Sequence, residues 1–151
     1  MSTLNLEKIF SPRGIAVIGA NEDPSSVGGT IFKNLIDGGY EGPLFPVNPK
    51  RKKVWDKKAF PAVADLPEKT DLAVIATPAS TVPDLVDQCG EAGIGGVIVA
   101  SAGFRETGEK GARLAQNVLE KARPHGVRIL GPNCLGIVMP HRQINASFSA
   151  S

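Results

Sequence analysis

Residues 14–29 constrain the fold more than any other stretch of the chain. Residues 14–21 read GIAVIGAN, an apolar run that ends in glycine, and residues 25–29 (SSVGG) open an amphipathic segment. This order predicts a buried strand, a loop and a helix N-terminus, where backbone N–H groups and the helix dipole attract phosphate. The loop departs from the G-x-G-x-x-G fingerprint of dinucleotide-binding domains, because Asn21 stands in place of the second glycine.

Apolar runs alternate with amphipathic segments along the rest of the chain. We expect strands at residues 14–19, 44–47, 72–76, 97–100 and 127–130, with a last short strand at 137–139. We expect helices from Ser25 or Ser26, at about 80–92 and at about 108–122, and a short helix near residues 4–10. The helix at 108–122 is expected to bury Leu114, Ala115, Val118, Leu119 and Ala122.

This alternation predicts an α/β fold, a Rossmann-like doubly wound and mainly parallel sheet with helices on both faces. Pro46 favours an edge or strand-end position over a central one, because proline cannot donate to a sheet ladder. The 151 residues suit one domain.

Composition excludes several classes of function. The net charge of +2 is too small to indicate a nucleic-acid partner. No apolar run approaches the roughly 20 residues that span a membrane, and we expect neither a membrane partner nor a signal peptide. Cys89 and Cys134 lack metal-ligand spacing, so no metal site is predicted. With only two cysteines we expect no disulfide framework, and the expected location is the cytoplasm.

The candidate ligand site follows from the fold, because open α/β sheets bind ligands beyond the carboxyl ends of their strands. The residues after each predicted strand are small or carry glycine, proline or hydroxyl groups, which ordinary turn chemistry also favours. The candidate binding residues at these tips are Gly19, Ala20, Asn21, Ser25, Ser26, Val27, Gly28, Asn48, Lys50, Thr77, Pro78, Ala79, Ser101, Ala102, Gly103 and Asn133.

The tip of the second strand indicates the kind of ligand. An NAD site places an acidic residue here, whereas this chain has Lys50 and Arg51. Basic residues suit a nucleotide with an extra ribose phosphate, and both coenzyme A (CoA) and NADP fit that description. The neighbouring lysines are expected to be solvated; they are Lys52, Lys53, Lys57 and Lys58.

No catalytic residue is predicted. Cys134 and Cys89 are interpreted as packing residues, and His125 and His141 as solvent-facing. Glu106 is either a ligand contact or a cap for the helix that follows it.

Six motifs in order carry a resemblance to a known family: FSPRGIAVIGA (10–20), VG (27–28), PVNPK (46–50), DLAVIATPA (71–79), SAGF (101–104) and GPNCLG (131–136). With them the chain resembles the CoA-binding domain of the nucleoside-diphosphate-forming acyl-CoA synthetases. That superfamily includes acetate–CoA ligase (ADP-forming), the succinyl-CoA synthetase alpha subunit and bacterial acetyltransferases with a synthetase-like region. NPK and SAGF resemble the acetate–CoA ligase branch.

The resemblance implies CoA or acyl-CoA as a ligand that is not covalently bound. It assigns the nucleotide phosphates to the loop at residues 19–28 and a CoA phosphate to Lys50. It assigns the adenine and pantetheine path to residues 77–79 and 101–104, and the thiol end to residues 131–133. One departure is that the family commonly has glycine after the valine at position 54, where this chain has Trp55 and Asp56.

In the family, the chemistry passes through a phosphorylated histidine on a following domain and an ATP-grasp domain beyond it. We therefore expect residues 1–145 to form a CoA-binding domain and residues 146–151 a flexible end, with CoA and those downstream domains as partners. Alone, the chain is expected to bind and not to catalyse. The alternatives are an NADP-binding half of an oxidoreductase, a CoA-sensing region of a protein acetyltransferase and a scaffold without a nucleotide.

Overall fold

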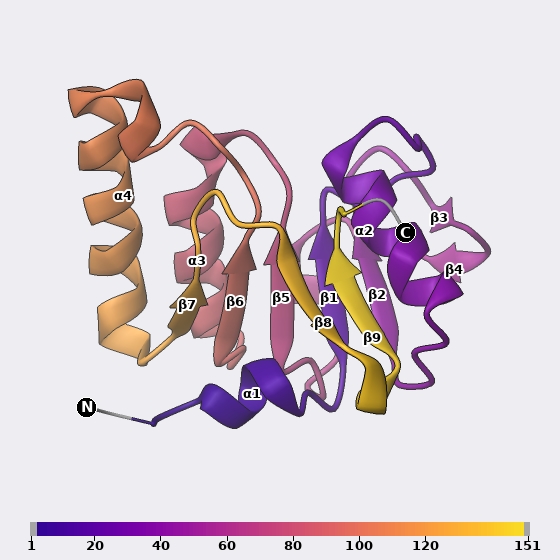
Figure 1. Ribbon diagram of the computed structural model, residues 1–151. Coiled ribbons are helices and arrows are strands. Elements are labelled where there is room, and N and C mark those ends of the chain that lie inside the picture. Colours follow the sequence, from indigo (N-terminus) through magenta and orange to yellow (C-terminus); the bar gives the residue numbers. More distant parts are fainter. Residues whose placement is uncertain (1–2, 150–151) are drawn as a thin grey trace.

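The computed structural model describes residues 3–149 and contains a five-stranded parallel sheet in the order β2-β1-β5-β6-β7 (Figure 1). Strand β1 is an interior strand between β2 and β5, and β2 lies at one edge, a position that Pro46 favoured. The Rossmann-like α/β prediction is confirmed. The strands are β1 (Ile15–Ile18), β2 (Leu44–Val47), β5 (Leu72–Ile75), β6 (Gly96–Val99) and β7 (Arg128–Leu130).

The interior strands are apolar because helices or other segments cover both of their faces. Every residue of β1, β5 and β6 is buried. Ile15 of β1 pairs with Leu44 on one side and Leu72 on the other, and the pairing continues in register to Ile18. Continuous apolar runs are typical of parallel strands in doubly wound sheets.

Helices pack on both faces of the sheet (Figure 1). On one face, α2 (Val27–Asp37) contributes Phe32 and Leu35 to a core with Val17 and Val74. On the other, α3 (Val82–Glu91) and α4 (Glu109–Ala122) pack over the alternate strand residues. The prediction that Leu119 is buried is wrong: it is 44% exposed, because the buried stripe of α4 runs through Gly111, Ala115, Val118 and Ala122.

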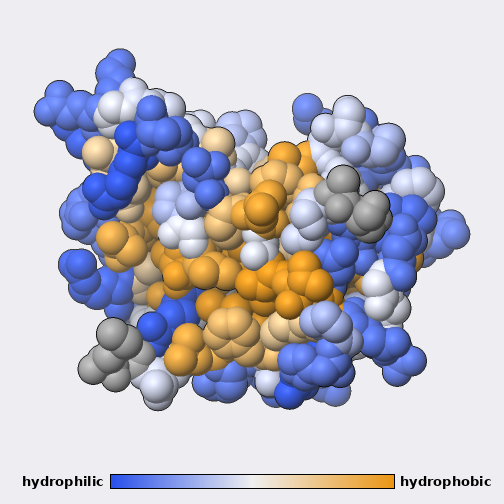
Figure 2. All heavy atoms as spheres, in the orientation of Figure 1, coloured by the Kyte–Doolittle hydropathy of each residue, from blue (hydrophilic) through white to orange (hydrophobic). Residues whose placement is uncertain are grey.

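An antiparallel hairpin of β8 (Gly136–Met139) and β9 (Ile144–Ser147) lies on the face that carries α2 (Figure 1). The Asn34 side chain of α2 donates to the Ser147 carbonyl at 2.9 Å. The sequence predicted a flexible end from residue 146 onward, but residues 146 and 147 belong to a buried strand. Residues 150–151 lie outside the described range. Figure 2 shows apolar surface in the middle of this face, and Leu135 and Val138 are 58% and 53% exposed.

Three short elements complete the framework. In α1 (Leu6–Phe10), Ile9 is buried while Phe10 is exposed. Strands β3 (Lys53–Val54) and β4 (Lys57–Lys58) form a small hairpin. Its turn residues Trp55 and Asp56 both have positive φ, 47° and 64°, so the side chains occupy a conformation that glycine adopts more easily.

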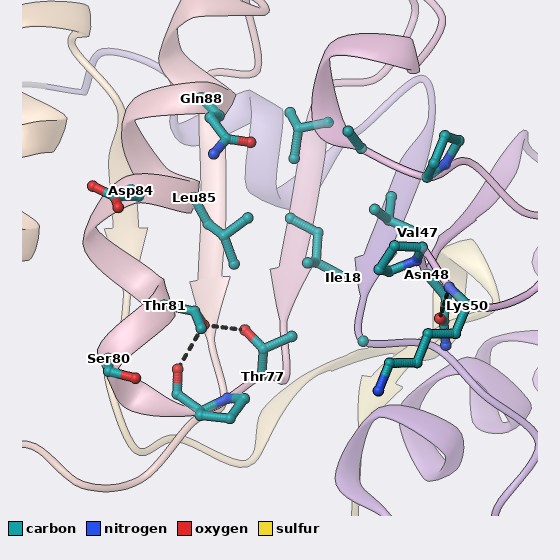
Figure 3. A pocket seen from close by; sticks show the side chains of 16 residues that line it. Ile18, Val47, Asn48, Lys50, Thr77, Ser80, Thr81, Asp84, Leu85 and Gln88 are labelled. Atoms are coloured by element: carbon teal, nitrogen blue, oxygen red, sulfur yellow. Dashed lines mark hydrogen bonds between the residues drawn. The ribbon is translucent and has the colours of Figure 1, made fainter.

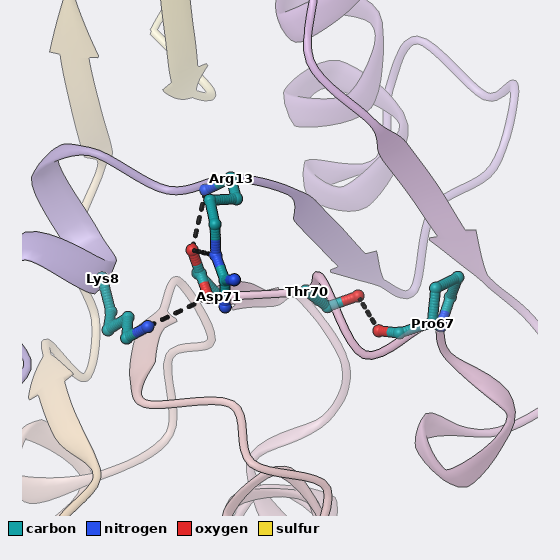
Figure 4. A network of polar contacts seen from close by, with 5 residues as sticks. All are labelled: Lys8, Arg13, Pro67, Thr70 and Asp71. Atoms are coloured by element: carbon teal, nitrogen blue, oxygen red, sulfur yellow. Dashed lines mark hydrogen bonds and ion pairs between the residues drawn. The ribbon is translucent and has the colours of Figure 1, made fainter.

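Asp71 organises the opposite edge of the sheet, at the amino ends of the strands (Figure 4). Its carboxylate accepts hydrogen bonds from the Arg13 backbone and guanidinium at 2.8–2.9 Å, and from Lys8 at 3.3 Å. The Arg13 hydrogen bond outweighs burial and lowers the pKa of Asp71 to about 2. This network fixes α1 and the start of β1 to β5. Within residues 3–149, no helix is long and apolar enough to cross a membrane.

Candidate functional site

Two glycines allow α2 to begin directly over the tip of β1. Gly19 has φ +96°, and a Cβ there would lie 2.9 Å from the Ala76 carbonyl oxygen. A Cβ on Gly28 would lie 2.1 Å from the Gly19 carbonyl oxygen. Such contact excludes any side chain, so the glycines permit the close approach of helix to strand that phosphate-binding loops use.

Polar side chains hold the intervening loop in one conformation. Asn21 Oδ1 accepts from the Asp23 backbone at 2.7 Å, and Ser26 Oγ accepts from the Gly29 N–H at 3.0 Å. Ser26 is therefore the helix cap, and Ser25 instead donates to Asp23 at 2.7 Å. That hydrogen bond lowers the pKa of the Asp23 carboxyl. The loop is ordered by its own contacts.

The tip of β2 is joined to this loop through Asn48. Its Nδ2 donates to the Ala20 carbonyl at 3.0 Å, and its Oδ1 accepts from the Lys50 N–H at 2.9 Å. Lys50 is exposed, and its ammonium has no ion-pair partner within the described residues. The ammonium is thus available to a ligand.

A cleft of about 750 Å³ opens at the carboxyl ends of β1, β2 and β5 (Figure 3). This is the switch point of the sheet, where the strand order reverses between β1 and β5. Five predicted site residues line it: Gly19, Asn48, Lys50, Thr77 and Pro78. A smaller cleft of about 440 Å³ lies alongside, lined by Asn21, Asp23, Asn48, Lys50 and Arg51. Lys50 borders both.

The tips of β6 and β7 form a second group of predicted residues that is linked to the first. Ser101 Oγ donates to the Thr77 carbonyl at 2.5 Å, and the Asn133 N–H donates to the Ser101 carbonyl at 2.9 Å. Gly103 has φ +106°, and a Cβ there would meet Ala79 at 3.1 Å. Thr77 lines the larger cleft, whereas Ala79, Ser101, Ala102, Gly103 and Asn133 line neither cleft. The same holds for Ala20, Ser25, Ser26, Val27 and Gly28.

Glu106 folds back on the tip of β6. Its Oε1 accepts from the Phe104 N–H at 2.8 Å and from the Gly103 N–H, and these hydrogen bonds lower the pKa of the carboxyl. Its carboxylate therefore closes the loop that precedes α4 and does not cap that helix.

The cysteines and histidines form no catalytic group. Burial raises the pKa of the Cys89 thiol to about 12 and also raises the pKa of the half-buried Cys134, so neither thiol is activated as a thiolate. The prediction that His125 faces solvent is wrong, because its Nε2 lies 2.9 Å from Asp87 and its side chain is 24% exposed. No group of three potential metal ligands occurs among the described residues.

One wall of the larger cleft was missed by the sequence analysis. It comes from the segment after β4, from the turn that leads into α3 and from α3 itself. Its residues are Pro61, Ala62, Val63, Ser80, Thr81, Asp84, Leu85 and Gln88. Thr81, Leu85 and Gln88 follow the i, i+4, i+7 spacing of one helix face, a signal that was available in the sequence.

Fold and site together define a Rossmann-like α/β domain with a ligand cleft at its switch point. Residues 13–140 match a family described as CoA binding domain. Because this match takes in most of the chain, the chain belongs to the CoA-binding domain family.

Two relatives are ADP-forming ligases. The chain is 44% identical over 144 residues to the alpha subunit of acetate–CoA ligase [ADP-forming] II from Pyrococcus furiosus, covering 95% of this chain and 31% of that relative. It is 42% identical to 4-hydroxybutyrate–CoA ligase [ADP-forming] from Nitrosopumilus maritimus, covering 86% and 18%.

A solved structure is similar to this chain in both fold and sequence. The dinucleotide-forming acetyl-coenzyme A synthetase 1 of Ca. Korarchaeum cryptofilum, in complex with phosphate and ADP, matches with a TM-score of 0.92 and 38% identity, over 97% of this chain and 32% of that one. The chain thus spans about a third or less of these proteins' lengths. The NADP oxidoreductase and acetyltransferase alternatives gain no support from these similarities.

Proposed function

We propose that this domain binds CoA or acyl-CoA, without a covalent bond, at the carboxyl edge of its sheet. The observation that carries the proposal is the position of Lys50, which borders both clefts and has an unpaired ammonium within the described residues. A nucleotide in the larger cleft places a ribose phosphate within reach of this ammonium. Lysine binds phosphate as a compact charge.

The first loop supports the same ligand. The N-terminus of α2 presents backbone N–H groups and the positive end of the helix dipole at the end of the loop that Asn48 joins to Lys50. Arg51 adds a second cation at the smaller cleft. We assign the pyrophosphate to residues 19–28 and the ribose phosphate to Lys50.

The linked tips of β6 and β7 suit the pantetheine arm. Thr77, Ser101 and Asn133 are connected by hydrogen bonds and lead away from the cleft along the edge of the sheet. We assign the thiol end to the neighbourhood of Asn133. No side chain here is proposed to be catalytic.

The relatives suggest the wider activity, an ADP-forming ligation of a carboxylic acid to CoA in which this domain supplies the CoA. We propose that the phosphohistidine and nucleotide-binding parts of such a synthetase act on acyl groups brought to this edge. The exposed apolar surface at Leu135 and Val138 supports contact with further protein. The reduced cysteines Cys89 and Cys134 support a cytoplasmic location.

Calorimetric titration with CoA, dephospho-CoA and NADP tests the proposal. We expect CoA to bind more tightly than dephospho-CoA, since only CoA carries the ribose phosphate, and NADP to bind weakly. Binding of NADP without CoA would contradict the proposal. The isolated domain, given acetate, ATP and CoA, is expected to form no ADP.

A further inference from the structure

The larger cleft has two chemically different ends. Figure 3 shows Lys50 on one side and Leu85 and Gln88, from α3, on the other. Asp84 lies beside Leu85, so the α3 side carries a carboxylate while the β2 side carries an ammonium. This asymmetry favours phosphate groups near Lys50 and an uncharged part of the ligand near α3.

The lining between Lys50 and Gln88 is mostly apolar. Ile18, Val47, Val63 and Leu85 contribute aliphatic side chains, and prolines line the cleft at positions 49, 61 and 78. Burial of an aromatic heterocycle against such surface is favourable in proportion to the apolar area that it covers. A heterocyclic base also needs polar partners for its edge.

Gln88 supplies the carboxamide that is free to serve that edge. The two threonine hydroxyls nearby are already engaged: Thr77 and Thr81 bond to each other at 2.7 Å, and Thr81 reaches the Pro78 carbonyl at 2.6 Å. Ser80 and Asp84 also line the cleft, but neither combines a separate donor and acceptor group as an amide does. The Gln88 amide makes no hydrogen bond within the described residues, and Figure 3 shows it pointing toward the cleft. A carboxamide offers one acceptor and one donor in the pattern that adenine complements.

We propose that Gln88 is a specificity-determining residue that reads the amino edge of the adenine base of CoA. Its carbonyl oxygen accepts from the exocyclic amine, and its NH₂ donates to the adjacent ring nitrogen N1. The base packs against the partly buried Leu85 while the ribose phosphate reaches Lys50. This inference rests on the proposed function, because it assigns the adenine of the ligand proposed there.

Paired titrations with CoA and 1,N6-etheno-CoA test the assignment, because the etheno bridge removes the amine donor and blocks the adjacent ring nitrogen. Gln88→Met keeps the length and helix preference of the side chain but removes the amide. We expect this variant to bind CoA about tenfold more weakly, with unchanged affinity for etheno-CoA. Gln116→Met, an exposed change on α4, is the matched control and should alter neither affinity.

The outcomes separate the two proposals. If Gln88→Met binds CoA like the unchanged domain, or if it weakens both ligands equally, the role of Gln88 is overturned while CoA binding stands. If the unchanged domain binds CoA not at all, the proposed function falls, and the assignment of Gln88 falls with it.

Discussion

The side-chain amide of Asn48 donates a hydrogen bond to the carbonyl oxygen of Ala20 at 3.0 Å, joining residues 28 positions apart. Asn48 directly follows β2 and lines the cleft, and Ala20 is buried at the start of the loop between β1 and α2. The same side chain accepts from the Lys50 N–H. One amide therefore sets the position of the loop relative to the cation beside it.

Replacing Asn48 with alanine is expected to lower the free energy of unfolding by about 1–2 kcal/mol, because the buried Ala20 carbonyl loses its side-chain donor. Affinity for CoA should fall as well, since Lys50 loses its anchor. Urea unfolding and calorimetry measure the two effects. Asn117→Ala, on the exposed side of α4, should lower neither quantity.

Lys50→Ala is expected to weaken CoA binding about tenfold while leaving dephospho-CoA affinity nearly unchanged, because the lysine pairs with the ribose phosphate. Lys52→Ala removes an exposed lysine that lines neither cleft and should leave both affinities unchanged. Equal losses for CoA and dephospho-CoA in the Lys50 variant would remove the role assigned to Lys50.

Gly28→Ala is expected to destabilise the domain by about 2 kcal/mol or more, although alanine favours helices, because the added Cβ would meet the Gly19 carbonyl oxygen at 2.1 Å. Gly38→Ala at the other end of α2, with φ −72° and a nearest contact of 3.0 Å, should cost much less. Thermal and urea unfolding compare them. Similar stability of the two variants would contradict the packing described at Gly28.

Asp71→Asn is expected to flatten the acid dependence of stability. The folded pKa of Asp71, about 2, lies below its ordinary value. The ionised carboxylate therefore stabilises the fold above about pH 4, and that stability is lost as the pH falls toward about 2. The unchanged domain should lose about 2 kcal/mol over this interval through Asp71. Asp65→Asn, an exposed change, should keep the full slope in urea unfolding.

The parallel sheet could be predicted because its strands are continuous apolar runs punctuated by glycine and proline. Leu44–Val47 matches the prediction at both ends, and Ile15–Ile18 and Leu72–Ile75 lie within the predicted ranges. The edge position of β2 followed from Pro46. Because the strands are parallel, their carboxyl ends lie at one edge of the sheet. The residues at the strand tips could therefore be predicted to lie close together.

The remaining features depend on tertiary contacts that local pattern does not encode. Strand β9 (Ile144–Ser147) has only two strongly apolar positions for its hairpin and gains its burial from β8 and α2. The burial of His125 depends on Asp87, which is 38 positions away. The prediction considered only the residues that follow each strand. It therefore missed the face of α3 that contains Gln88 and lines the cleft beside those strand tips.

Glu106 occupies the backbone N–H groups of Gly103 and Phe104 with a carboxylate from its own chain. Such paired amides would otherwise be a second place for an anion to settle. The Glu106 carboxylate therefore occupies this potential anion-binding position. A free phosphate or a CoA phosphate would have to displace Glu106 to bind there. This contact supports the proposed assignment of the uncharged pantetheine arm to the tip of β6 and of the phosphates to the loop between β1 and α2.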